Sequence, residues 1–129
     1  MLSEKQPITV SAASTNSLNE SVVVNPTHTM IAEVRVTTAF TGTALSTLQV
    51  KIQGSADAAF TTPVDLVSSP AIDISKLKIG KAIQVPIPFV DDQTLTYTRA
   101  YYVASATMTA GAVTTVIQPQ VYTNTSNKA

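Results

Sequence analysis

Short runs in which apolar and polar residues alternate recur along the chain. The clearest run covers residues 48–53, which are in turn Leu48, Gln49, Val50, Lys51, Ile52 and Gln53. A period of two places one set on each face of a β-strand, so this run predicts a strand with one dry side and one wet side. Turn-forming residues at 54–57 end the run, a short apolar return follows at 58–60, and a second strand is expected at 64–69.

Weaker alternation and β-branched runs predict further strands at residues 8–13, 21–25, 30–38, 71–74, 82–87, 99–106 and 112–122. Residues 108–111 are interpreted as a hairpin connection and residues 91–93 as a turn. Residues 1–7 are expected to form a mobile N-terminal arm, and residues 123–129 a polar tail.

These elements predict an all-β fold. About eight short strands, separated by Gly, Ser, Asn and Pro and without a convincing helix, are typical of an antiparallel β-sandwich with jelly-roll-like topology. A chain of 129 residues suits one such domain, covering residues 1–129. Pro86 and Pro88 lie at the end of the expected strand 82–87, and because proline cannot donate to a strand ladder, we expect the end of that strand at a sheet edge or leaving the sheet.

The composition agrees with this fold and indicates a protein that works in an assembly. The chain contains 20 Thr and 15 Val, which favour pleated surfaces. Only 12% of its residues are charged, against about 25% in an average domain, and eight cations balance eight anions. A neutral chain has no long-range attraction to nucleic acid or to an anionic membrane, and little protection against self-association. We therefore expect protein partners, and neither nucleic acid nor membrane.

Features that report on cellular location are few. The chain has no cysteine, which excludes disulfides and fits synthesis in a reducing cytoplasm. The first seven residues are polar, and no apolar run approaches the roughly 20 residues of a membrane span. Neither a secretion signal nor a membrane segment is expected.

Residues that could carry chemistry are sparse. His28 is the only histidine, and a plain surface position in a loop is favoured for it. Asp91-Asp92 would point to opposite sides of an extended chain, so a solvated turn is favoured over a cation site. Asp57, Asp65 and Asp73 lack the glycine-containing pattern of a calcium loop. A Ser or Thr nucleophile needs an oriented base, which this sequence does not supply. We expect no enzyme activity, no metal and no cofactor.

Two groups of residues could contact another protein. Lys76, Lys78 and Lys81 form a basic connection, which is either a solvated loop or a contact for an acidic protein. The lack of interleaved aromatic residues argues against nucleic acid there. The tyrosines are the second group, because Tyr is favoured at interfaces as well as in cores. Tyr101 and Tyr102 are expected on opposite faces of one strand.

Four stretches carry a resemblance to a known family: residues 11–16 (SAASTN), 34–44 (VRVTTAFTGTA), 48–72 (LQVKIQGSADAAFTTPVDLVSSPAI) and 101–115 (YYVASATMTAGAVTT). They are similar to capsid cement (decoration) proteins of tailed bacteriophages, related to those of short-tailed Bordetella-type phages. The resemblance covers roughly residues 8–117, and residues 55–63 are its most distinctive part. The sequence departs from the family pattern at residues 19–21 and in the polar tail.

The resemblance implies a jelly-roll-like β-sandwich that binds the outer surface of an icosahedral head as a trimer and clamps neighbouring major capsid subunits. Capsid or trimer contacts are then expected in the arm, in the basic connection and at two tyrosines: Ser3, Glu4, Lys5, Gln6, Lys76, Lys78, Lys81, Tyr101 and Tyr102. Phe60 is expected to anchor its loop to the core. The alternative is a carbohydrate-binding or adhesin-like sandwich on a virion, against which the lack of Trp and of a secretion signal argue.

Overall fold

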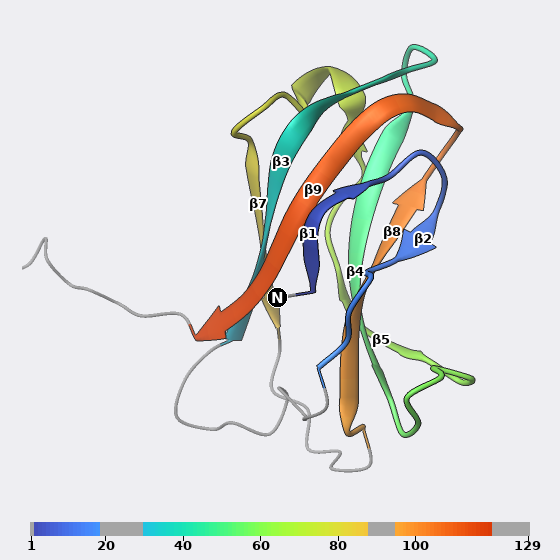
Figure 1. Ribbon diagram of the computed structural model, residues 1–129, viewed down its shortest axis with the longest axis vertical. Coiled ribbons are helices and arrows are strands. Elements are labelled where there is room, and N and C mark those ends of the chain that lie inside the picture. The colour runs from blue at the N-terminus through green and yellow to red at the C-terminus, as the bar shows by residue number, and fades with distance from the viewer. Residues whose placement is uncertain (1, 19–29, 88–94, 120–129) are drawn as a thin grey trace, which may run out of the picture.

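The computed structural model describes residues 2–18, 30–87 and 95–119, which form two antiparallel sheets packed face to face (Figure 1). The strands in these ranges are β1 (Ser3–Pro7), β2 (Ala12–Ala13), β3 (Met30–Gly42), β4 (Thr47–Ser55), β5 (Val64–Ser68), β6 (Ile72–Asp73), β7 (Ala82–Ile87), β8 (Tyr97–Ala104) and β9 (Met108–Pro119). A single turn of 3₁₀ helix, η2 (Ile74–Lys76), follows β6.

The strand order is that of a jelly roll. Sheet A has the order β1-β9-β3-β7, and sheet B has the order β2-β8-β4-β5, with β6 as an additional partner of β4. Apart from the run β4 to β6, each strand is followed in the chain by a strand of the opposite sheet. Eight strands connected in this way form a double-sheet jelly roll, so the expected fold class is confirmed. β7 lies at the edge of sheet A, as predicted from Pro86 within it.

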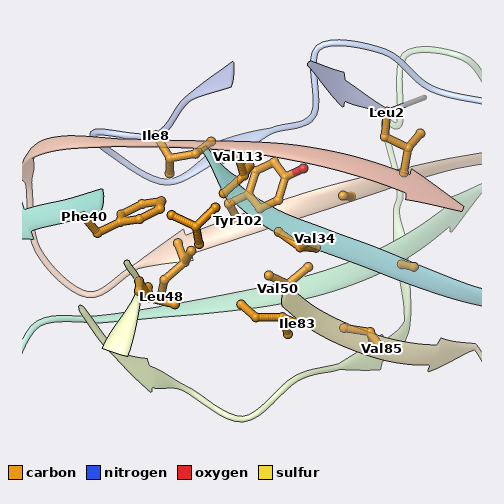
Figure 2. Packing of buried hydrophobic residues seen from close by; sticks show 14 of the residues in the cluster. Leu2, Ile8, Val34, Phe40, Leu48, Val50, Ile83, Val85, Tyr102 and Val113 are labelled. Carbon is orange, nitrogen blue, oxygen red and sulfur yellow. The ribbon is translucent and has the colours of Figure 1, made fainter. Parts of the chain in front are cut away.

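Alternate residues of the strands fill the space between the sheets (Figure 2). The inner strands β3 and β4 each contribute three side chains that are at most 1% exposed: Ala32, Val34 and Val36, and Leu48, Val50 and Ile52. The alternating residues 48–53 therefore form a strand with one buried face, as predicted. Each fully buried apolar side chain contributes about 1.5–3 kcal/mol, so this interior is the main source of stability.

The beginning of β9 differs from the prediction. Residues 108–111 are not a hairpin connection, because Met108 and Ala110 pair with Gly42 and Thr41 of β3. Gly111 has a φ of 146°, a value that disfavours other residues, and the Phe40 ring occupies the space beside it. The glycine that suggested a turn thus allows β9 to pass closely over an aromatic ring.

The expectation of a mobile arm over residues 1–7 is corrected by β1, which pairs with β9. Leu2 is fully buried, and its N–H donates to the carbonyl of Thr115 at 2.8 Å. The sequence Ser-Glu-Lys-Gln has no apolar alternation, so the neighbouring strand rather than local preference fixes this segment. Several expected features lie outside the described residues: the strand at 21–25, the turn at 91–93, the tail at 123–129, and His28, Asp91 and Asp92.

Loops from both sheets meet at one end of the sandwich, the upper end in Figure 1, here called the loop end. It consists of residues 8–11, 43–46, 74–81 and 105–107. Backbone hydrogen bonds tie these loops together: Met108 N to Thr9 O at 2.7 Å, Ser105 N to Thr47 O at 3.0 Å, and Ile74 N to Ser46 O at 3.0 Å. The loop end is therefore a connected surface.

Gly111→Ala is expected to destabilise the protein by about 2–4 kcal/mol, because a Cβ would lie 2.4 Å from the Phe40 ring and φ is positive. Gly80→Ala is the matched control, since Gly80 also has a positive φ, of 92°, but no atom within 4 Å of the added Cβ. It is expected to cost only about 1 kcal/mol. Urea unfolding measures both variants; equal losses would contradict a steric role for Gly111.

Candidate functional site

The four predicted contact residues in β1 divide into two pairs. Ser3 is fully buried and Gln6 is 8% exposed, whereas Glu4 and Lys5 are exposed. In a regular strand, residues three apart lie on opposite faces. The register shifts between Ser3 and Gln6, where Lys5 has a φ of 49°, and this bulge turns both side chains inward. Glu4 and Lys5 remain accessible to a partner, whereas the side chains of Ser3 and Gln6 are buried.

Tyr102 belongs to a buried polar bridge between the sheets. Its hydroxyl lies 2.8 Å from Ser3 Oγ and 2.6 Å from Thr115 Oγ1. The single Ser3 hydroxyl proton is directed to Gln6 Oε1 at 2.6 Å, so Tyr102 donates to Ser3 and accepts from Thr115. Burial raises the pKa of Tyr102, and its two hydrogen bonds oppose that shift. Tyr102 is fully buried and joins β8 of sheet B to β1 and β9 of sheet A.

The remaining predicted contact residues lie on separate surfaces. Lys76, Lys78 and Lys81 are exposed at the loop end. Tyr101 is half-buried on the outer face of sheet B, so the prediction that it faces away from Tyr102 is confirmed. The structure thus does not bring the nine predicted residues together on one surface, and the basic connection is the largest exposed group among them.

The lysines at the loop end are not neutralised by ion pairs. The described part of the chain contains two salt bridges, neither of which involves them: Arg35 with Glu33 at 3.2 Å, and Lys51 with Asp65 at 3.1 Å. Asp73 precedes the lysines, and its carboxylate accepts from the Ser75 N–H at 2.9 Å. This bond, more than the nearby Lys76, lowers the pKa of Asp73. The loop end therefore carries net positive charge.

A groove of about 310 Å³ lies between the edge of sheet A and the β5–β6 side of sheet B. Its lining consists of residues 67–70, Ile72 and residues 81–86, and is mostly apolar. Lys81 belongs both to this lining and to the loop end, so the groove begins beside the basic turn.

The outer face of sheet B carries a polar network that the sequence did not predict. Arg99 Nε donates to Gln53 Oε1 at 2.9 Å, and Gln53 Nε2 donates to Asp65 Oδ1 at 2.9 Å. Lys51 Nζ donates to the second oxygen of Asp65. The hydrogen bond from Gln53, and then Lys51, lower the pKa of Asp65. The sequence held a signal, because the alternation at 48–53 places Lys51 and Gln53 on the wet face, but the partners depend on strand register.

The β4–β5 loop, the most distinctive part of the family resemblance, folds around Asp57. The Phe60 N–H donates to the Asp57 carbonyl at 3.1 Å, and the Asp57 carboxylate accepts from the hydroxyls of Ser55 and Thr61. The Thr61 and Ser55 hydrogen bonds lower the pKa of Asp57. Because the folded pKa is below the ordinary value of 3.8, this contribution to loop order is present above that pH and is lost as the pH falls through the folded pKa.

Phe60 anchors this loop, but not to the core as predicted. The side chain is 7% exposed, yet it does not belong to the cluster between the sheets. The Arg99 guanidinium carbon lies 4.4 Å from the centre of the Phe60 ring and 5.5 Å from that of Tyr101, both within cation–π range. The loop therefore lies against the outer face of sheet B and covers part of the polar network.

The strand order places this protein in the class of double-sheet jelly rolls. No cluster of three or more metal-ligating side chains occurs in the described ranges, and no helix there is long and apolar enough to cross a membrane. The polar side chains of the network on the outer face of sheet B form hydrogen bonds with one another. Jelly rolls of this kind recur in viral capsid proteins and in lectin domains.

Residues 2–117 match the Bbp16 family, and the chain belongs to that family. Its namesake is the capsid cement protein of Bordetella phage BPP-1, so the resemblance to phage cement proteins is confirmed. Among curated proteins, none matched the chain. Membership of a structural capsid family implies a non-enzymatic protein that binds the capsid at the virion surface.

Tyr102→Phe is expected to lower the free energy of unfolding by about 1–2 kcal/mol, because it removes the central hydroxyl of the buried bridge. Tyr101→Phe is the control on the adjacent position, where the ring faces outward, and is expected to change stability by less than about 0.5 kcal/mol. Chemical denaturation followed by circular dichroism measures both; equal effects would show that the bridge does not contribute.

Phe60→Ala is expected to cost about 1.5–3 kcal/mol, because it removes a buried ring and its contact with Arg99. Ala59→Ser, in the exposed part of the same loop, is the control and is expected to be close to neutral. The free energies of unfolding of both variants test this, and a loss near zero for Phe60→Ala would mean that the ring does not hold the loop.

Proposed function

We propose that this protein is a cement protein that binds the outer surface of an icosahedral phage head as a homotrimer and stabilises the lattice of major capsid subunits. The family match over residues 2–117 is the observation that carries the proposal. The jelly roll supports it, since a rigid sandwich holds its loops in fixed positions for contact with another protein.

Stabilisation follows from selective binding to the assembled lattice. A ligand that binds the assembled state and not its separated subunits shifts the equilibrium toward assembly by mass action. Such a protein needs shape and buried area rather than reactive groups. The low charge content, 12% of residues, suits burial of its surface because few charged groups lose water on binding.

A trimer would strengthen attachment without strong single contacts. Once one copy is bound, the others meet their sites at a high effective concentration, and overall affinity rises. The formal net charge of zero favours such self-association, since copies have no net charge through which to repel one another.

The alternative, a carbohydrate-binding or adhesin-like module, finds less support. Tyr97 and Tyr101 lie on the outer face of sheet B, where a sugar could stack. Arg99 lies between them, however, and is engaged by Gln53 and the Phe60 ring. A face whose polar groups are already paired offers few donors and acceptors to a sugar.

Removal of the protein from purified heads is expected to lower the temperature at which they release DNA, and re-addition to restore it. Fluorescent dye release during heating measures both steps. Analytical ultracentrifugation of the purified protein should give three times the chain mass. Heads that are equally stable with and without the protein would contradict the cement function, and a monomer both free and on the head would contradict the trimer.

A further inference from the structure

The loop end gathers most of the exposed large apolar side chains. Among the described residues, four such side chains are exposed: Leu45 (83%), Ile79 (74%), Val10 (54%) and Val64 (47%). The first three belong to the loops of the loop end, whereas Val64 begins β5 beyond the β4–β5 loop. Clustering of exposed apolar residues on connected loops is a feature of protein interaction sites.

Leu45 is unusual both in its backbone conformation and in the exposure of its side chain. It lies in a tight turn, in which the Ser46 N–H donates to the Thr43 carbonyl, and its φ is 69°. That conformation suits Gly or Asn and is strained for a bulky residue. The same side chain is the most exposed large apolar group described. Its strained backbone and its exposure both disfavour a leucine here, which makes the side chain a candidate for contact with another molecule.

Ile79 is held at the tip of a second turn. The Lys81 N–H donates to the Lys78 carbonyl at 3.0 Å, and Gly80 has the positive φ, of 92°, that such a turn requires. The Gly80 N–H donates to the Val36 carbonyl of β3 at 3.0 Å, which fixes the turn to sheet A. The isoleucine is therefore presented by a rigid support.

Positive charge lies beside Ile79, whose turn includes Lys78 and Lys81. The loops of the loop end contain three charged residues, all of them lysines: Lys76, Lys78 and Lys81. In the four loops no Asp or Glu balances them, and Asp73 beside them already caps η2. Exposed apolar side chains on a positively charged surface are complementary to a partner surface that combines apolar recesses with carboxylates.

From this arrangement, and resting on the proposed function, we infer that the loop end is the surface that docks on the phage head. Its partner is an acidic protein surface with apolar recesses, which Leu45 and Ile79 enter at separate points while the lysines contact carboxylates. A second copy of this chain is a poorer occupant. Copies related by rotation about this end would bring like-charged lysines together.

Re-addition of variants to heads stripped of the protein tests the inference. Ile79→Asp and the double variant Lys78→Glu/Lys81→Glu are each expected to raise the half-saturating concentration at least about tenfold. Their controls are Val64→Asp, an exposed apolar residue away from the loop end, and Lys51→Glu, a lysine in the middle of β4 on the outer face of sheet B. Both controls are expected to bind within about twofold of the unmodified protein. Binding of the unmodified protein should also weaken as salt is raised.

The variant Leu45→Gly distinguishes a role of Leu45 in docking from a role in folding. Glycine removes the strain at φ 69°, so the free protein should unfold at the same or a higher temperature, while attachment to heads weakens at least about fivefold. A loss of stability together with attachment would mean that Leu45 serves the fold, and would overturn its role in docking.

The outcomes distinguish this inference from the function on which it rests. If the unmodified protein fails to bind stripped heads, the cement function itself fails. If it binds and the loop-end variants bind equally well, docking occurs elsewhere and the inference is wrong. If the loop-end variants change the oligomeric state in solution, the loop end is a contact between copies, which also overturns the inference.

Discussion

The placement of β9 between β1 and β3 is the interaction on which the rest of the structure depends. It joins the beginning and the end of the described chain in one sheet, and it contributes Val113 to the interior and Thr115 to the polar bridge with Tyr102. Without β9, β1 would have no strand partner and the sandwich no complete second layer. Pairing between strands so far apart in the sequence orders most of the chain before the new contacts offset the lost conformational entropy. The jelly roll therefore folds as one cooperative unit.

The same dependence explains how much of the fold the sequence predicted. β4 and β7 have strong alternation, and their faces were predicted because local pattern and tertiary packing agree. The bounds of β7 are those predicted, whereas β4 continues to Ser55, through two residues that were expected to form a turn. β1 has no such pattern, and only the pairing with β9 makes it a strand. Gly111 was read as a turn because a glycine that creates room for Phe40 cannot be told from one that bends the chain.

The candidate site was predicted in part for a similar reason. The basic connection was visible because three lysines stand close together in the sequence. The strain at Leu45 and the exposure of Ile79 were not visible, since both depend on turns that the neighbouring strands hold in place. Tyr102 and Ser3 were expected at a contact surface, but a bulge at Lys5 and the register of β8 place them in the interior.

In this account the protein has two parts with different roles: an apolar interior with one polar bridge provides stability, and the loop end, which we infer to be the docking surface, exposes apolar and basic groups. Amide hydrogen exchange, compared between the free and the head-bound protein, tests this division most directly. Residues 43–46 and 76–81 should exchange more slowly on the head, while residues 57–63 exchange as in the free protein. Slowing at another surface with no change in those two loops would contradict docking through the loop end.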